Sequence, residues 1–348
     1  MQVLRAIAAS MVVLCHLGGN YRNYFTGTTS FESLIPLKAG VDLFFVLSGF
    51  IITFVHWKDL GQRSKLSLYI RKRLVRIMPL YLALLAIEFL FFYWQAIHPT
   101  LILPHKFEAD QPTLKLLILN IFFLSPNTFV SASWTLCYEM LFYFFFCFSI
   151  VFGKSFLKWS CLLWGIIVIG LRAKHVHIDA YDGTFKFLLW EMTNHHILEF
   201  LFGVAVAAYI KLKNPKFNAG LLGLGIVLFI LGLFIPDTAH YGDLCHAALA
   251  IGSAGIVLHL VTLETNRSLR TPRWLKILGD ASYSTYLSHL IFMDGLFMVI
   301  ATKYGYFKLH PTTWQLILVY FLILPCTLGV YFGIEKPFTE WSRKKFAR

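Results

Sequence analysis

The chain of 348 residues is 57% hydrophobic, 17% aromatic and only 14% charged, which excludes an ordinary soluble domain. Its formal net charge of +13 is also typical of proteins that bind nucleic acid. Basic residues beside apolar segments are more simply explained as topology determinants and as contacts with anionic lipid or a phosphorylated ligand. We therefore expect an integral membrane protein that contacts membrane lipid and binds no nucleic acid.

Ten apolar segments approach the length of about 17 to 25 residues that a helix needs to cross a bilayer. They lie at 1–18, 40–57, 78–97, 134–152, 157–171, 190–210, 219–235, 243–263, 280–301 and 313–334. An eleventh segment, 114–124, is too short to cross unaided. The 6 cysteines show no CxxC spacing, so neither a disulfide framework nor a zinc site is indicated. We expect an all-α bundle of about ten transmembrane helices in one domain over 1–348, without a separate soluble domain.

The distribution of lysine and arginine orients this bundle. If the segment 114–124 does not cross, 22 basic residues lie on the side of the two termini and 9 on the other side. If it crosses, the counts become 13 and 18. The positive-inside rule therefore favours ten spans with both termini in the cytoplasm.

The first apolar segment carries Arg5 near its start and His16 near its end. Eleven residues of helix place both side chains on one face, about 16 Å apart. Polar groups in an apolar span are costly unless they face protein or water. This face is therefore the first candidate for a functional surface.

Two other positions near the membrane boundaries have two interpretations each. Asp42 starts the second span on the outer side, the side of His16, and is either a carboxylate stabilised by the helix dipole or a partner for a histidine. Arg73 and Arg76 end the basic loop 58–77 and share a helix face. They either anchor the topology or bind a phosphate-bearing ligand with their forked donors.

Polar residues also lie within later spans. Glu139 is about a turn and a half into the fourth span, where a carboxylate usually has a partner or a task, and His289 is well inside the ninth. In the sixth span, Glu191, His195 and Glu199 are four residues apart and are expected to stack along one helix face. A polar lining or a hydrogen-bond network explains them better than a metal site, and we predict no metal.

Six motifs occur in order along the chain. They are LRAIA at 4–8 with His16, GVDLFFVLSGFIIT at 40–53, RKRLVRIMPLY at 71–81, SWTLCYEMLFY at 133–143, LGDASYSTYLSH at 278–289 and EKPF at 335–338. This ordered set resembles the membrane-bound acyltransferase 3 family, which O-acylates sugars and related molecules. The resemblance implies an acyl-coenzyme A donor, most simply acetyl-coenzyme A, bound from the cytoplasm. It also implies a glycan hydroxyl as acceptor on the far side of a bacterial inner membrane.

By similarity, His16 is the catalytic histidine and Arg5 is its companion on the same helix. Arg73 and Arg76 engage the donor, and Glu335 is a further functional carboxylate, which we group with Arg5 and the arginine pair as donor-binding residues. The motif positions Asp42 and Glu139 are assigned to catalysis with His16, and the role of His289 stays open. An imidazole with an ordinary pKa near 6.5 suits proton removal from a hydroxyl, and arginines suit the negative charges of coenzyme A.

The separation of these residues across the membrane sets a requirement for the reaction. The basic loop is cytoplasmic and His16 is towards the outer side, so the pantetheine arm would have to thread a polar passage through the bundle. A transporter or flippase is the alternative, although repeated halves or paired broken helices are not visible in the sequence. A non-catalytic receptor would leave His16 and the arginine pair without a task.

Overall fold

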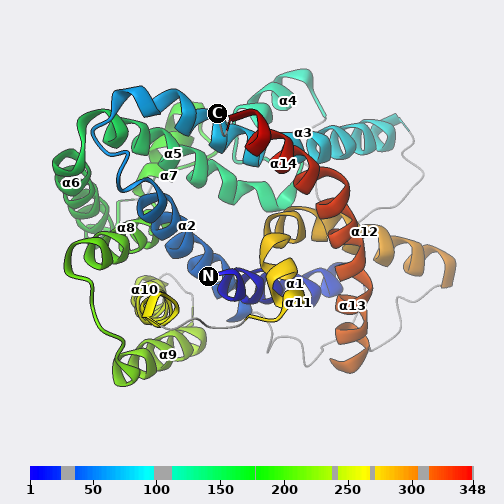
Figure 1. The fold of residues 1–348 in the computed structure, drawn as a ribbon. Coiled ribbons are helices and arrows are strands. Elements are labelled where there is room, and N and C mark those ends of the chain that lie inside the picture. The colour runs from blue at the N-terminus through cyan, green and yellow to red at the C-terminus, as the bar shows by residue number, and fades with distance from the viewer. Residues whose placement is uncertain are drawn as a thin grey trace. The chain divides into compact units, whose positions relative to one another are not determined.

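The computed structural model of the protein describes residues 1–24, 36–97, 112–176, 178–236, 242–266, 271–304 and 313–346. These residues form helices and connecting turns and contain no β-strand (Figure 1). The prediction of an all-α protein is confirmed.

Each predicted span coincides with helical structure, and the helices are numbered in chain order. The N-terminal half contains α1 (Gln2–Tyr24), α2 (Gly40–His56), α3 (Leu66–Ile97), α4 (Leu114–Ile121), α5 (Trp134–Phe152) and α6 (Lys154–Ala173). The remainder contains α7 (Thr184–Thr193), α8 (His196–Lys213), α9 (Ala219–Phe234), α10 (Gly242–Asn266), α11 (Arg273–Asp280), α12 (Ser282–Tyr304), α13 (Thr313–Val330), a π-helical turn (Tyr331–Glu335) and α14 (Lys336–Phe346).

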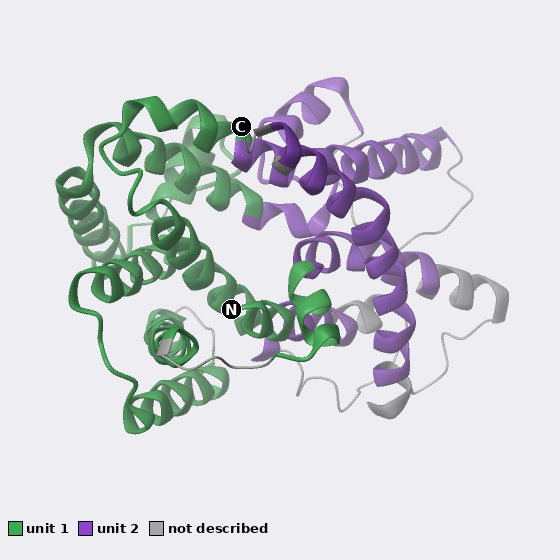
Figure 2. Cartoon of the chain, in the orientation of Figure 1, with its two compact units in different colours: residues 1–8, 38–71, 136–280 green, residues 9–37, 72–135, 281–348 purple. Residues whose placement is uncertain are grey.

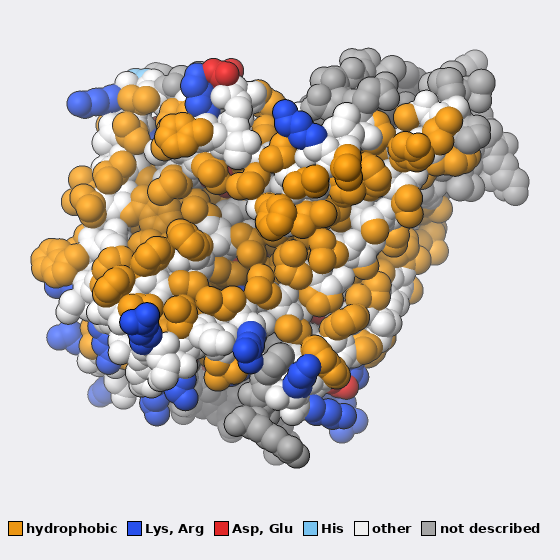
Figure 3. All heavy atoms as spheres, turned by 90° about the horizontal axis from the view of Figure 1, so that it is seen from above, with side chains coloured by type: hydrophobic (Ala, Val, Ile, Leu, Met, Phe, Trp, Pro, Cys, Tyr) orange, Lys and Arg blue, Asp and Glu red, His pale blue; other side chains and the backbone are white. Residues whose placement is uncertain are grey.

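Several of these helices are long and apolar enough to cross a membrane. In the described part of the chain, 6 helical stretches meet that requirement: Pro36–His56, Arg63–Ile97, Ser131–Phe152, Lys154–Ala173, Gly242–Thr265 and Ile317–Ser342. The bent pair α7 and α8 gives a seventh if it is one span, and Gln2–Gly18 and Ala219–Phe234 are shorter apolar helices. Hydrophobic side chains cover most of the surface seen in Figure 3. The chain is therefore an integral membrane protein, whereas ten spans and cytoplasmic termini stay predictions.

The sixth predicted span is not one continuous helix. α7 ends at Thr193, α8 begins at His196, and the two are bent by 46°. Asn194 between them has an extended backbone, and its side-chain oxygen accepts a hydrogen bond from the His196 backbone N–H at 3.2 Å. Asparagine is a strong helix-start residue because it satisfies such N–H groups. The prediction that Glu191, His195 and Glu199 stack along one helix face is therefore wrong.

The chain divides into two compact units, each assembled from separate stretches of sequence (Figure 2). Unit 1 contains residues 1–8, 38–71 and 136–280, and unit 2 contains residues 9–37, 72–135 and 281–348. Consequently α1, α3 and α5 each begin in one unit and end in the other. The single domain over 1–348 stays a prediction.

Within unit 1, α2 and α8 are in close backbone contact. A Cβ atom at Gly49 would lie 2.2 Å from the Phe200 carbonyl oxygen, and one at Gly203 would lie 2.1 Å from the Val46 carbonyl oxygen. Only glycine fits at both positions, as is common where membrane helices approach closely.

The same two helices run parallel. Asp42 and Glu199 carry carboxylate oxygens within 4.8 Å of each other, and 12 residues further along each helix the Lys211 ammonium lies 3.6 Å from the centre of the Phe54 ring. Two parallel membrane helices require an odd number of crossings between them, which α3, α5 and α6 provide if α4 does not cross. α4 has 8 residues, about 12 Å of helix, which is too short to cross alone.

Candidate functional site

In unit 2, His16 of α1 and His289 of α12 form a pair. The His289 Nε2 atom lies 3.1 Å from the His16 Nδ1 atom, and the ring centres are 5.0 Å apart. His289 is fully buried. The sequence left the role of His289 open, and the structure brings it to the histidine that the sequence singled out.

The hydrogen bonds of this pair determine where its protons lie. The His289 Nδ1 atom is 2.7 Å from the carbonyl oxygen of Tyr286, and the His16 Nδ1 atom is 3.0 Å from that of Val12. Carbonyl oxygens only accept hydrogen bonds, so in the neutral rings both Nδ1 atoms carry a proton. The His289 Nε2 atom then accepts from the His16 Nδ1–H. This tautomer leaves the lone pair of His16 on Nε2, the nitrogen that can act as a base.

Glu335 holds the first turn of α12. Its Oε2 atom accepts hydrogen bonds from the Ser284 backbone N–H at 3.1 Å and from the Ser284 hydroxyl at 2.6 Å. The carboxylate is buried, and Glu335 is the last residue of the π-helical turn. A carboxylate at a helix N-terminus satisfies unpaired N–H groups and is stabilised by the helix dipole. Glu335 thus fixes the start of the helix that carries His289.

The remaining contacts of α12 reach other motifs. The Tyr283 hydroxyl donates to the carbonyl oxygen of Ile77 in α3 at 3.0 Å, and the Thr135 hydroxyl donates to the Tyr286 hydroxyl at 2.9 Å. Together with His16 and Glu335, these contacts connect the motif at 278–289 with four of the five others. The motif at 278–289 is therefore the centre of the polar contacts of unit 2.

Arg73 and Arg76 lie on α3 just before Ile77, also in unit 2. Both are half-buried, whereas Arg71 and Lys72 of the same helix are exposed. Because residues three apart share a helix face, the arginine pair occupies the more buried side of the helix. Lipid-facing or solvent-facing anchors do not need that burial.

The other predicted site residues, Arg5, Asp42 and Glu139, lie in unit 1. The Arg5 guanidinium donates to the Gln2 side-chain oxygen at 3.3 Å, and Glu139 accepts a hydrogen bond from the Tyr143 hydroxyl on its own helix. Arg5 and His16 share α1 but belong to different units. Asp42 has a histidine partner, His246, which the sequence analysis did not single out.

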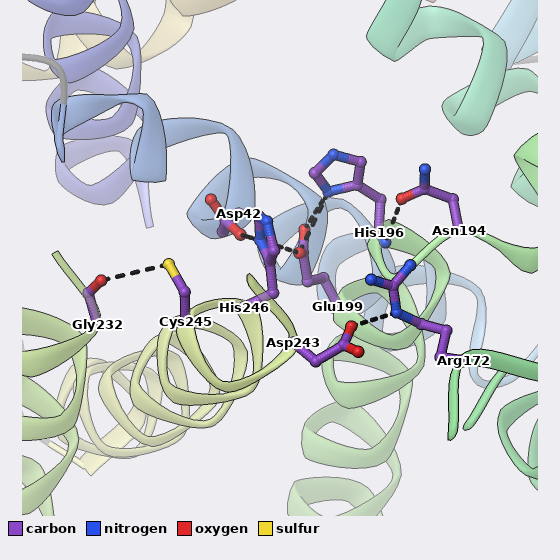
Figure 4. A network of polar contacts seen from close by, with 9 residues as sticks. All are labelled: Asp42, Arg172, Asn194, His196, Glu199, Gly232, Asp243, Cys245 and His246. Carbon is purple, nitrogen blue, oxygen red and sulfur yellow. Dashed lines mark hydrogen bonds and ion pairs between the residues drawn. The ribbon is translucent and has the colours of Figure 1, made fainter. Parts of the chain in front are cut away.

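Asp42 belongs to a cluster in unit 1, which we call the unit 1 cluster: Asp42, His195, His196, Glu199 and His246. Figure 4 shows its members other than His195. The His246 Nδ1 atom lies 2.8 Å from the Asp42 Oδ1 atom and 3.8 Å from the Glu199 Oε1 atom. The His196 Nδ1 atom lies 3.1 Å from the Glu199 Oε2 atom. The sequence analysis named Asp42, His195 and Glu199 of this set, whereas it did not single out His196 or His246.

The described fold is a helical membrane protein that holds a histidine pair, a half-buried arginine pair and a buried carboxylate in one unit. The family model described as an acyltransferase domain matches residues 1–335, and the chain belongs to this acyltransferase 3 family. It is thus a membrane acyltransferase.

One curated protein is similar to the chain. The exopolysaccharide production protein ExoZ of Rhizobium meliloti (strain 1021) is 28% identical over 283 residues, which are 72% of this chain and 75% of that protein. No solved structure matches the chain.

Proposed function

We propose that this acyltransferase moves an acetyl group from acetyl-coenzyme A, bound from the cytoplasm, to a hydroxyl of a cell-envelope glycan at the far side of a bacterial inner membrane. The observation that carries the proposal is the His16–His289 pair, held by a helix on which four motifs converge. A polysaccharide acceptor is supported by the similarity to a protein named for exopolysaccharide production.

The proposed reaction starts with proton removal. The His16 Nε2 atom takes the proton of the acceptor hydroxyl while the hydroxyl oxygen attacks the thioester carbonyl carbon. The new C–O bond forms, the C–S bond breaks, and the departing coenzyme A sulfur receives the proton from the His16 imidazolium. The products are the acylated glycan and free coenzyme A thiol. The reaction needs no oxidant and forms no covalent acyl-enzyme.

His289 is a positioning residue in this scheme. Its Nε2 atom accepts the His16 Nδ1–H, which keeps the His16 ring oriented and its Nε2 atom unprotonated before reaction. During proton transfer, the same hydrogen bond stabilises the positive charge that develops on His16.

Donor binding is assigned to Arg73 and Arg76, whose guanidinium groups match phosphate oxygens with two parallel hydrogen bonds. Arg5 and Glu335 complete the donor-binding set. For Glu335, the structure supports an indirect contribution, since it accepts two hydrogen bonds from Ser284 at the start of α12. Asp42 and Glu139 stay candidates for catalysis.

The test is acyl transfer by the purified full chain in lipid vesicles, with labelled acetyl-coenzyme A inside and an extracted cell-envelope glycan outside. A general base contributes about 10²–10⁴-fold, so His16→Ala should lose at least about 100-fold in both thiol release and glycan labelling. The matched control is His259→Ala, because His259 is also a buried histidine in an apolar helix but belongs to unit 1 and is outside both polar clusters.

Two results would contradict the proposal. One is wild-type acyl transfer by His16→Ala. The other is movement of the glycan across the membrane without release of coenzyme A thiol, which would favour the transporter or flippase. Among the described residues, α7 and α8 are the one bent helix pair of this kind, whereas transporters of that type commonly have broken helices in pairs.

A further inference from the structure

The unit 1 cluster lies where three helices begin. Asp42 is in the first turn of α2, Glu199 is in the first turn of α8, and His246 is the fifth residue of α10 (Figure 4). These residues are buried, with 2%, 1% and 9% of their surfaces exposed, respectively. The fold thus brings together ionisable side chains from three separate stretches of sequence.

The two buried carboxylates receive few hydrogen bonds. An ionised carboxylate accepts at about four positions. Among the described residues, Asp42 and Glu199 interact with two imidazole rings, those of His246 and His196, and share a hydrogen bond with each other. Buried negative charges with so few donors are unfavourable unless a cation compensates them.

Two effects act on these carboxylates in opposite directions. Burial and the nearby Asp42 disfavour a negative charge on Glu199 in the absence of a cation, whereas the helix ends favour it. The N-terminus of each helix carries a partial positive charge of about half a unit, and three such ends meet here. Ionised carboxylates are the form that binds metal. Two of them carry two negative charges, which one divalent cation neutralises, whereas one protonated histidine neutralises only half.

The donor atoms have the spacing of a metal site. The ligand atoms of Asp42, Glu199 and His246 all lie within 4.8 Å of one another, and the ligand atoms of His195, His196 and Glu199 do so as well. Tetrahedral zinc with bonds of about 2.0–2.2 Å separates its donors by about 3.3 Å. The measured separations of 2.8, 3.1 and 3.8 Å lie around that value.

His195 gives a second, independent observation. Both of its ring nitrogens are inaccessible and have no hydrogen-bond partner, and its ring lies 3.5 Å from that of His246, centre to centre. A buried imidazole without a partner for either nitrogen is unfavourable. Its ligand atom lies within 4.8 Å of those of His196 and Glu199, so a metal ion would give it a bonding partner.

The site also has a fixed frame and a neighbouring cavity. This cavity of about 110 Å³ is lined in part by Trp190, Thr193 and Asn194, which precede His195 in the chain. Arg172 at the end of α6 pairs with Asp243 in the first turn of α10, which holds the helix that carries His246.

We propose that the unit 1 cluster binds one divalent metal ion of the zinc type, with Asp42, Glu199 and His246 as ligands and a further imidazole from the His195–His196 pair. Two carboxylate oxygens and two imidazole nitrogens suit Zn²⁺ or Mn²⁺. The ion would join the starts of α2, α8 and α10, so its role is to stabilise unit 1.

The test measures metal content and stability, not activity. The full chain is purified in detergent without an affinity tag of histidines, stripped with a chelator, and dialysed against Zn²⁺ alone or Mn²⁺ alone. The wild type should retain about one equivalent of one of these ions by elemental mass spectrometry, and reloading should raise its thermal midpoint.

Two substitutions keep the size of the side chain and its ability to form hydrogen bonds but remove its negative charge, so the variants are expected to fold. Asp42→Asn and Glu199→Gln should each lower the retained metal at least about tenfold and remove the metal-dependent rise in the thermal midpoint. His259→Asn, a buried histidine of the same α10 outside the cluster, should retain the wild-type amount. The proposal is overturned if the wild type retains neither ion, or if the two cluster variants retain as much as His259→Asn. In the first case, Asp42 and Glu199 share a proton instead.

Discussion

At the scale of single residues, His16 and His289 have different proposed roles. His16 is the base, and His289 positions its ring. His16 has its proton on Nδ1, between the Val12 carbonyl and the Nε2 atom of His289, whose own Nδ1–H donates to the Tyr286 carbonyl. The direction of this short chain of hydrogen bonds follows from the carbonyl at its end. A change at His289 therefore acts through His16.

His289→Ala tests this relation. The variant removes the side-chain acceptor of the His16 Nδ1–H and leaves only the Val12 carbonyl, so we expect kcat to fall about 10–100-fold, in line with the loss of a hydrogen bond to a charged group. The KM for acetyl-coenzyme A should change less than about twofold, because His289 is not assigned to donor binding. Steady-state kinetics in vesicles separates the two parameters, and a raised KM at unchanged kcat would place His289 at the donor instead.

At the scale of helices, α12 depends on a carboxylate that is distant in sequence. Glu335 lies 51 residues after Ser284, yet accepts two hydrogen bonds from it. The π-helical turn Tyr331–Glu335 precedes this contact directly. Because Ser284 and His289 lie on the same helix, we expect a substitution of Glu335 to alter the position of His289.

The contribution of Glu335 can be resolved with two substitutions. Glu335→Ala removes the acceptor at the helix start and should cost about 0.5–2 kcal/mol of stability, as other lost helix caps do, and also lower kcat. Glu335→Gln keeps an acceptor oxygen and should lose less of both. Thermal unfolding and kinetics are measured together. If Glu335 contacts the donor directly, both variants will raise the KM for acetyl-coenzyme A while stability stays at the wild-type value.

For the whole molecule, the parallel course of α2 and α8 bears on topology. It favours three crossings between them and leaves α4 on one side. This agrees with the lysine and arginine counts, which depend on the charge of the loops and not on helix packing. Both lines favour an α4 that does not cross, and the lysine and arginine counts favour cytoplasmic termini.

Labelling of single cysteines checks this topology. In a cysteine-free background, Lys115→Cys at the start of α4 and Thr128→Cys after it should both react with a membrane-impermeant maleimide added outside intact cells. A cysteine introduced at Arg348 should react only after the membrane is opened. Labelling of positions 115 and 128 from opposite sides would show that α4 crosses. Every later helix would then have the opposite orientation to the one predicted.

The sequence alone predicted the membrane class, the helices and the motif residues, whereas the ten spans stay a prediction. These are local properties: the length of an apolar segment determines whether a helix can cross, and the motifs are read directly. The break at Asn194 is also local, but the apolar residues around it concealed it, because hydrophobic patterns do not report an asparagine that caps a helix start.

Only the tertiary structure decided which polar residues are partners. His16 meets His289 across 273 residues, and Asp42 meets His246 across 204. Residue spacing within a helix fixes which side chains share a face, but it cannot fix which helices pack together, because that depends on close contacts such as Gly49 and Gly203. The sequence therefore determined a membrane acyltransferase with His16 as its candidate base, and the packing of the helices decided which groups surround it.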